Sequence, residues 1–415
     1  MMQISKEFAP PFKMIEPFFK YGSILYIFAI ASLLFIDSNS SLIDFKIVGF
    51  AHLFLLGFVM IVIFGAMAQL IPVVLEVGHF SVDLYYIIFP TLFIGTITLV
   101  SGFWFASALI PYGAMLVFVA MAVFLFETLM TLKQTTTNNI TVKSVKWGNY
   151  FLMAAIVVGF IMAVAIGNGL NIDITRLLPI HVVLVILGYV TVTIIGLSMV
   201  LLPMFGLAHG YDDKDVENAF KLLVGSVIGF SVLKLIGLDI LANISLLASV
   251  VAVGLYLKQL ITLYKIRARK LIDIWYKHIY TAFISLGLGT LIGAIGYYFG
   301  LDSFLKTALW IYVIGFFAFV INGHLLKIIP FLVWFERFSP LVGKKKVPML
   351  HEMLHDKDCE YSFWLSLSGL VIGAIGLLFS SDSLFKGAVL LLVVGAFFMY
   401  RSVKYILDFK EEDYV

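Results

Sequence analysis

The chain has 415 residues, of which 62% are hydrophobic and 13% charged, and its net charge is +3. Soluble globular chains are about half apolar and about a quarter charged, so this composition excludes a soluble enzyme and predicts an integral membrane protein in contact with the lipid bilayer. The sparse charge also excludes nucleic-acid binding and intrinsic disorder as main properties of the chain. A single cysteine, Cys359, leaves no intramolecular disulfide and no CxxC metal motif.

A membrane-spanning helix needs about 20 mostly apolar residues, and runs of that length recur along the chain. None of them alternates between polar and apolar residues as barrel strands do, so we expect an all-α integral membrane protein. Twelve transmembrane helices are predicted, at about 21–36, 46–75, 84–105, 108–132, 149–168, 177–206, 219–239, 242–264, 278–299, 304–335, 362–380 and 385–407. Together they predict a single membrane domain over residues 1–415.

The lysines and arginines predict the orientation of these helices. With both ends of the chain on the same side, the loops and tails of that side hold 21 Lys and Arg residues, against 4 on the other side. Cytoplasmic loops carry such an excess of basic residues. We therefore expect a multi-pass protein of a bacterial-type inner membrane with both termini in the cytoplasm, and a cytoplasmic loop at residues 336–361.

One glycine–proline frame, G-x7-G-x6-P, occurs in the second, sixth and tenth predicted helices. It is formed by Gly57, Gly65 and Pro72, by Gly188, Gly196 and Pro203, and by Gly315, Gly323 and Pro330. Small residues let helices approach closely in lipid, which accounts for single glycines but not for a shared frame. The frame predicts three pseudo-symmetric repeats of four helices, at about 17–132, 149–265 and 277–408.

A second internal similarity supports the idea of repeats. The run Ile292-Gly-Ala-Ile-Gly296 recurs as Ile372-Gly-Ala-Ile-Gly376. At matched distances the two runs are followed by Asp302-Ser303 and Lys306 and by Asp382-Ser383 and Lys386.

Three histidines inside predicted helices are candidate ligands. His52 and His181 lie near the starts of the second and sixth helices, and His324 lies near the end of the tenth. An imidazole at membrane depth is costly unless it has a partner, and neutral imidazole is a common ligand of haem iron and copper. We therefore take His52 and His181 as candidate cofactor ligands and all three histidines as candidate metal ligands. The alternative is a hydrogen bond to a neighbouring helix that serves packing alone.

The positions of these residues limit what they can share. His52 lies 20 residues before its frame proline and His181 lies 22 before its own, so about 200° of rotation would separate them in a common frame. They need not bind one metal. For Lys327, one turn after His324, we expect a side chain that reaches the headgroup region, with a proton or anion path as the alternative. Glu127 and Lys234, also inside predicted helices, are expected at the membrane interface.

The predicted loop after the tenth helix contains an HExxH sequence, formed by His351, Glu352 and His355. On a helix this spacing places two imidazoles on one face for zinc, with the glutamate as general base. Here the sequence lies in a loop of charged residues with no obvious third ligand. We therefore favour a solvated amphipathic segment and keep a zinc site as the alternative.

The twelve-helix pattern with three repeats and a histidine at the start of the second helix resembles subunit I of the haem–copper oxidases. The stretch from His52 to Gly57, followed by Gly65 and Pro72, is similar to the second helix of NnrS-type proteins, which are linked to haem, copper and nitric-oxide stress. Gly323-His324 with Pro330 is similar to a glycine–histidine–proline pattern in their later helices. The resemblance implies that His52 is the first candidate for a haem axial ligand.

The sequence also departs from the oxidases. The resemblance implies a second haem ligand at the start of the tenth helix, where this chain has Trp310 and Tyr312. It also implies copper ligands from the sixth helix, where His181 could serve, and a histidine pair from the seventh. The seventh helix, at about 219–239, has no histidine. The oxidase copper site cannot be assembled from this set, so we expect no oxygen reduction by the protein on its own.

Three functions follow. The first is a haem-binding membrane protein, with copper as a further candidate, in respiratory electron transfer or nitric-oxide stress handling. A redox partner or a second membrane subunit would then complete the site, and any haem would be non-covalent because no CxxCH sequence is present. If the protein is an enzyme, we expect an oxidoreductase. The second function is a cofactor-free transporter or assembly partner on the same scaffold, and the third is a zinc metalloprotease.

Overall fold

The computed structural model describes residues 10–75, 77–410 and 412. Within these ranges the chain is helical and has no β-strand, and twelve helical spans are long and apolar enough to cross a membrane. The expected all-α membrane architecture with twelve transmembrane helices is therefore confirmed. The grouping into three four-helix repeats stays a prediction. The termini lie outside the described residues, so their expected cytoplasmic location stays a prediction as well.

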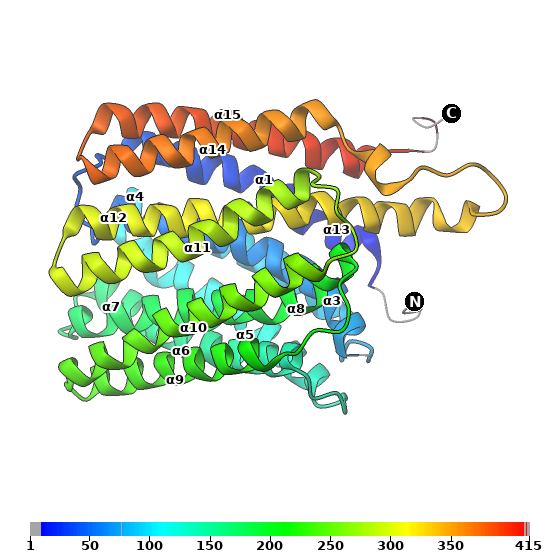
Figure 1. Ribbon diagram of the computed structural model, residues 1–415. Helices are drawn as coiled ribbons and strands as arrows, with labels where there is room; N and C mark the ends of the chain where they lie inside the picture. Colours follow the sequence, from blue (N-terminus) through cyan, green and yellow to red (C-terminus); the bar gives the residue numbers. More distant parts are fainter. Residues whose placement is uncertain (1–9, 76, 411, 413–415) are drawn as a thin grey trace. The chain divides into compact units, whose positions relative to one another are not determined.

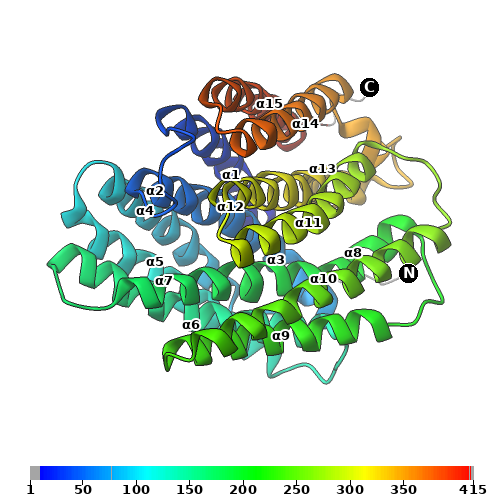
Figure 2. The same ribbon diagram turned by 60° about the vertical axis from the view of Figure 1, so that its left-hand side comes forward.

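The helices form two compact units. The first unit, Gln69–Leu271, contains the end of α3 (Ile61–Leu75), α4 (Tyr85–Trp104), α5 (Ile110–Leu132), α6 (Ile140–Asn168), α7 (Ile174–Val183), α8 (Val192–Gly206), α9 (Lys214–Leu235) and α10 (Asp239–Ile266). The second unit joins Pro10–Ala68 to the described residues from 272 onward. It contains α1 (Phe12–Ser32), α2 (Phe45–Phe54), the start of α3, α11 (Ile274–Phe299), α12 (Asp302–Trp310), α13 (Phe319–Arg337), α14 (Asp356–Leu378) and α15 (Asp382–Asp408). Consecutive helices pair within each unit, as α9 with α10 (Figure 1) and α14 with α15 (Figure 2).

Several helices extend beyond the apolar runs that predicted them. α6 begins at Ile140 rather than near residue 149, because the Asn139 side chain accepts a hydrogen bond from the Val142 amide at 2.9 Å and caps the helix. α13 continues to Arg337 and α14 begins at Asp356, so the loop expected at 336–361 is shortened to 338–355. Polar end turns of this kind are helical without being apolar, and hydropathy does not detect them.

The three spans that carry the glycine–proline frame are each interrupted by a π-helical segment. These segments are Leu55–Met60 between α2 and α3, Leu184–Thr191 between α7 and α8, and Ile311–Ala318 between α12 and α13. The first frame glycine lies inside the segment in every case. A π turn holds one more residue than an α turn and is frequent at functional sites, so the shared frame has a structural counterpart.

The frame glycines also bring each interrupted span close to the long helix that precedes it. In each pair, a Cβ added to the glycine would lie no more than 3.1 Å from the side chain of its partner. The pairs are Gly57 with Leu25, Gly65 with Phe18, Gly188 with Phe151, Gly196 with Ser144, Gly315 with Ser285, and Gly323 with His278. The glycines are eight residues apart in each span, and their partners are seven apart. We infer that the π turn takes up the additional residue and keeps the antiparallel helices in register.

The two ends of the second unit are held by different polar contacts. At one end, Arg337 donates a hydrogen bond to the Phe409 carbonyl and its guanidinium lies 5.9 Å from the Phe12 ring, so the start of α1 and the end of α15 are on the same side. At the other end, the Lys386 ammonium donates to three carbonyls that follow α1, those of Leu33, Leu34 and Ile36. The Asp382 carboxylate accepts from the Ser38 amide, and Lys306 donates to the Asn39 carbonyl. Both repeated lysines, Lys306 and Lys386, and one of the repeated aspartates, Asp382, thus hold this loop in place.

Two adjacent carboxylates between α8 and α9 have opposite electrostatic surroundings. Hydrogen bonds from the backbone and then the side chain of Lys214 lower the pKa of Asp212. Burial, and then the nearby Glu217 carboxylate, raise the pKa of Asp213. Folding therefore favours the ionised form of Asp212 and the protonated form of Asp213.

Candidate functional site

The three candidate histidines are each anchored through the same ring nitrogen. Nδ1 lies 2.8 Å from the Val48 carbonyl in His52, 3.0 Å from the Ala155 carbonyl in His181, and 2.6 Å from the Val320 carbonyl in His324. A carbonyl only accepts, so Nδ1 carries the hydrogen and donates it, and the lone pair is on Nε2. Histidines that ligate metals are usually held in this way, because the second hydrogen bond fixes the tautomer and the ring orientation.

His52 and His181 occupy equivalent places relative to the π-helical segments. Each lies three residues before the start of its segment, whereas the third interrupted span has Ala308 at that place. His52 and His181 differ by two residues in their distance from the frame prolines, but they lie at the same distance from their π-helical segments. His181 packs directly on α6, since a Cβ at Gly159 would lie 2.7 Å from its Cε1. This contact agrees with the packing alternative for His181.

His324 has the most distinctive surroundings of the three. Its Nε2 is buried and has no hydrogen-bonding partner among the described residues. The Trp275 ring stands perpendicular to the imidazole, with 6.0 Å between the ring centroids. One turn further along α13, the Lys327 ammonium lies 2.7 Å from the Asp273 carboxylate, and Asp273 also accepts from the Tyr276 amide at the start of α11. Lys327 is therefore held in an ion pair, and its expected position near the headgroup region stays a prediction.

A second buried acceptor lies two residues before His324. The Asn322 amide hydrogen-bonds the Tyr26 phenol, and its Oδ1 is buried with no partner in the described part of the chain. Tyr26 in turn stacks on Phe58 of the Leu55–Met60 segment, at 4.4 Å between centroids. α13 thus presents an amide oxygen and an imidazole nitrogen whose lone pairs no described donor satisfies. Native proteins rarely bury such acceptors without a water, an ion or a ligand to meet them.

The HExxH sequence does not form a single helical face. Leu350–Met353 is a short 3-10 turn, and Glu352 accepts from the Met349 amide at 2.7 Å. His355 lies beyond this turn and caps α14, with Nδ1 accepting from the Asp358 amide. Among the described residues, no three His, Cys, Asp or Glu side chains come together as a metal-binding group. The helical geometry on which the zinc interpretation depends is therefore not present.

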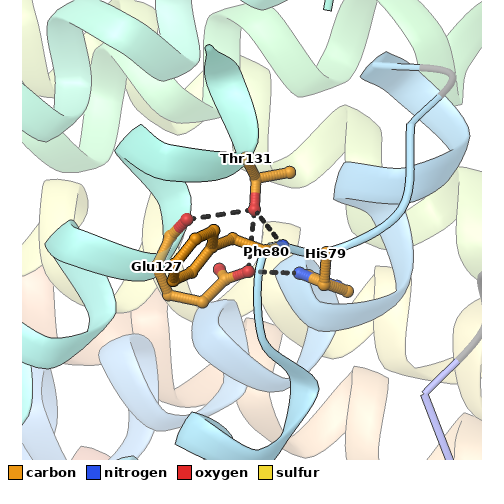
Figure 3. Close-up of polar contacts among 4 residues, drawn as sticks. All are labelled: His79, Phe80, Glu127 and Thr131. Carbon is orange, nitrogen blue, oxygen red and sulfur yellow. Dashed lines mark hydrogen bonds and ion pairs between the residues drawn. The ribbon is translucent and has the colours of Figure 1, made fainter. Parts of the chain in front are cut away.

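Glu127, which was expected at the membrane interface, has its carboxylate inside the protein. Its side chain is completely buried and lies 2.8 Å from Nδ1 of His79, whose side chain is also buried (Figure 3). A carboxylate inside an apolar helix is costly and is therefore a default functional candidate, so its presence in the sequence was the available indication. Lys234, by contrast, is partly exposed and pairs with Asp239 at the turn between α9 and α10.

No protein-family model and no curated protein sequence matches the chain.

Proposed function

We propose that the protein binds haem non-covalently through imidazole ligands and serves electron transfer or nitric-oxide handling in a bacterial-type inner membrane. The observation that carries this proposal is the buried Nε2 of His324, which has no partner among the described residues while Nδ1 is anchored to Val320. This donor has the chemistry of a haem axial ligand. The sequence resemblance adds His52, which is anchored in the same way.

The residues around His324 have definable roles in such a site. The Val320 carbonyl would hold the ring and make Nε2 a stronger donor. The ion pair of Lys327 with Asp273 places a partly exposed cation one turn away, where it would favour an anionic group of a ligand. The Trp275 indole packs against the edge of the imidazole and restricts its rotation. Haem would supply a redox-active iron that transfers electrons or binds nitric oxide.

Oxygen reduction is not part of the proposal. The seventh span, α9, contains no histidine, so the copper ligands implied by the oxidase resemblance are missing from the sequence. Copper bound through a single imidazole, and a redox partner or second membrane subunit that completes the coordination, remain compatible with the proposal. The 21 to 4 distribution of basic residues supports cytoplasmic termini.

The test is absorption spectroscopy of the purified full-length protein, with haem and metal content measured on the same preparation. We expect a haem spectrum in the wild type and its loss, or a marked shift of the reduced bands, in His324→Ala and His52→Ala. His209→Ala removes an exposed imidazole and should retain the spectrum.

Three results would contradict the proposal. A folded wild-type protein without haem, from cells that supply it, would favour the cofactor-free transporter or assembly partner. Zinc in place of haem, with a proteolytic activity that is abolished in Glu352→Ala, would instead favour the metalloprotease. Retention of haem in both His324→Ala and His52→Ala would refute the ligand assignment.

A further inference from the structure

The buried carboxylate of Glu127 is the centre of a polar cluster in the first unit. Its Oε1 lies 2.8 Å from Nδ1 of His79 and accepts a hydrogen bond from the Thr131 hydroxyl, also at 2.8 Å. The same hydroxyl oxygen accepts from the Phe80 amide at 2.9 Å, so the segment before α4 is joined to the end of α5 (Figure 3). Oε2 is buried and has no donor at hydrogen-bonding distance in the part of the chain that the structure describes.

Few basic groups lie near this carboxylate to balance its negative charge. His79 is the basic group paired with it among the described residues, and no described lysine or arginine contacts it. From α4, the fully buried Tyr85 phenol interacts with the carboxylate, and Tyr85 also interacts with Tyr189 of the Leu184–Thr191 segment. A buried carboxylate is stable only when it is paired or protonated. Its protonation state therefore depends on the imidazole beside it.

One shared proton gives this pair two forms. In the first, an imidazolium faces a carboxylate. In the second, the Nδ1–H bond of His79 breaks, its electron pair stays on the ring, and an O–H bond forms on Oε1 to give a carboxylic acid beside a neutral imidazole. A further proton has a place to bind on Oε2, which is buried and has no hydrogen-bonding partner by geometry among the described residues.

We propose that His79 and Glu127 form a proton-binding site inside the first unit, in which Glu127 takes up a proton from water and releases it again. Uptake converts the carboxylate beside an imidazolium into a carboxylic acid, with the proton on Oε2 and no other bond broken in the protein. Tyr85 and then Tyr189 are the next groups toward the interior. The Tyr189 hydroxyl is itself buried without a hydrogen-bonding partner among the described residues.

This site goes beyond the proposed haem function and does not depend on it, since its residues belong to the first unit and His52 and His324 belong to the second. The competing interpretation is a purely structural role, in which the cluster only holds the segment around Phe80 against α5; the Phe80 ring also packs on Phe126 at 5.5 Å. In a purely structural role, the carboxyl group would keep one protonation state at all accessible pH values. The two interpretations therefore differ in whether the carboxyl group changes state.

The experiment is infrared difference spectroscopy of the full-length protein in lipid nanodiscs, between neutral and acidic buffer, in H₂O and D₂O. We expect the wild type to gain the C=O stretching band of a buried carboxylic acid, with the downshift in D₂O that marks an exchangeable proton. Glu127→Gln should lose this band, and Glu336→Gln, which removes an exposed carboxylate, should keep it. A band of equal size in folded Glu127→Gln, or no such band in the wild type, would overturn the proposal.

A second variant covers the case in which Glu127→Gln does not fold. His79→Gln keeps the carboxyl group and removes the imidazole that shares its proton, so the carboxylic acid band gained in acidic buffer should differ in size from that of the wild type. Thr131→Val removes one hydrogen bond to Oε1 and should change the frequency of the band without removing it. A His79→Gln spectrum identical to that of the wild type would show that the pair does not share a proton.

Discussion

The close approach of Gly196 to α6 gives a stability prediction whose size can be worked from the structure. A Cβ at this position would overlap Cβ of Ser144 and lie 2.9 Å from its Oγ. Because a Cβ cannot rotate away, Gly196→Ala must push α8 from α6, and overpacking of this kind costs about 1–3 kcal/mol. The better helix propensity of alanine returns about 1 kcal/mol.

The matched control is Gly225→Ala in α9, where nothing lies within 4 Å of the added Cβ. Both changes share the propensity gain, so the difference between the two variants measures the overpacking alone, about 1–3 kcal/mol. The assay is thermal unfolding of each purified protein in the same detergent, where Gly196→Ala should unfold at a lower temperature than Gly225→Ala. Ser144→Gly added to Gly196→Ala should restore stability by removing the opposing Cβ. Equal stability of the two single variants would refute the packing argument.

Two other predictions concern polar groups outside the apolar core. Lys386→Met removes the ammonium that hydrogen-bonds three carbonyls after α1, and it should lower the free energy of unfolding by about 2 kcal/mol. Lys258→Met breaks an exposed ion pair and should change the free energy of unfolding by less than about 1 kcal/mol. Chemical denaturation of both variants in the same detergent compares the two effects. Asp213 has a raised pKa, so its contribution to stability is present in acid and is lost as the pH rises through that pKa. Asp213→Asn should therefore unfold at a higher temperature than the wild type at neutral pH, and this gain should vanish on acidification. Asp212→Asn should show the opposite sign, because the lowered pKa of Asp212 stabilises the fold above its unfolded pKa and that stability is lost in acid. Equal melting curves for the two variants across this pH range would contradict the assignment.

The functional residues differ in how far the sequence could reveal them. His52, His181 and His324 stand out because an imidazole is rare in apolar sequence, and all three have a fixed Nδ1 hydrogen bond in the structure. The structure makes His324 the strongest ligand candidate of the three, because its Nε2 is buried without a described partner. Burial of one atom depends on packing between helices, which no sequence pattern contains.

The HExxH sequence and Glu127 illustrate two limits of local reasoning. The spacing of HExxH has chemical meaning only on a continuous helix, and here the chain leaves its 3-10 turn at Leu354 before the second histidine. Glu127 seemed to be at the interface because it is near the end of a span. Its partner His79 comes from a segment 48 residues earlier, and that contact exists only when the segment folds back over α5.

The twelve helical spans, and the pairing of glycines with a proline in three of them, could be predicted from the amino-acid sequence. Apolar length is a local property, because a backbone in lipid must satisfy its hydrogen bonds within each helix. Tertiary structure alone decided the π-helical segments, the burial of Glu127 with His79, and the surroundings of His324. These features depend on contacts between helices that are distant in the chain, where one methyl group or one proton changes the favourable arrangement.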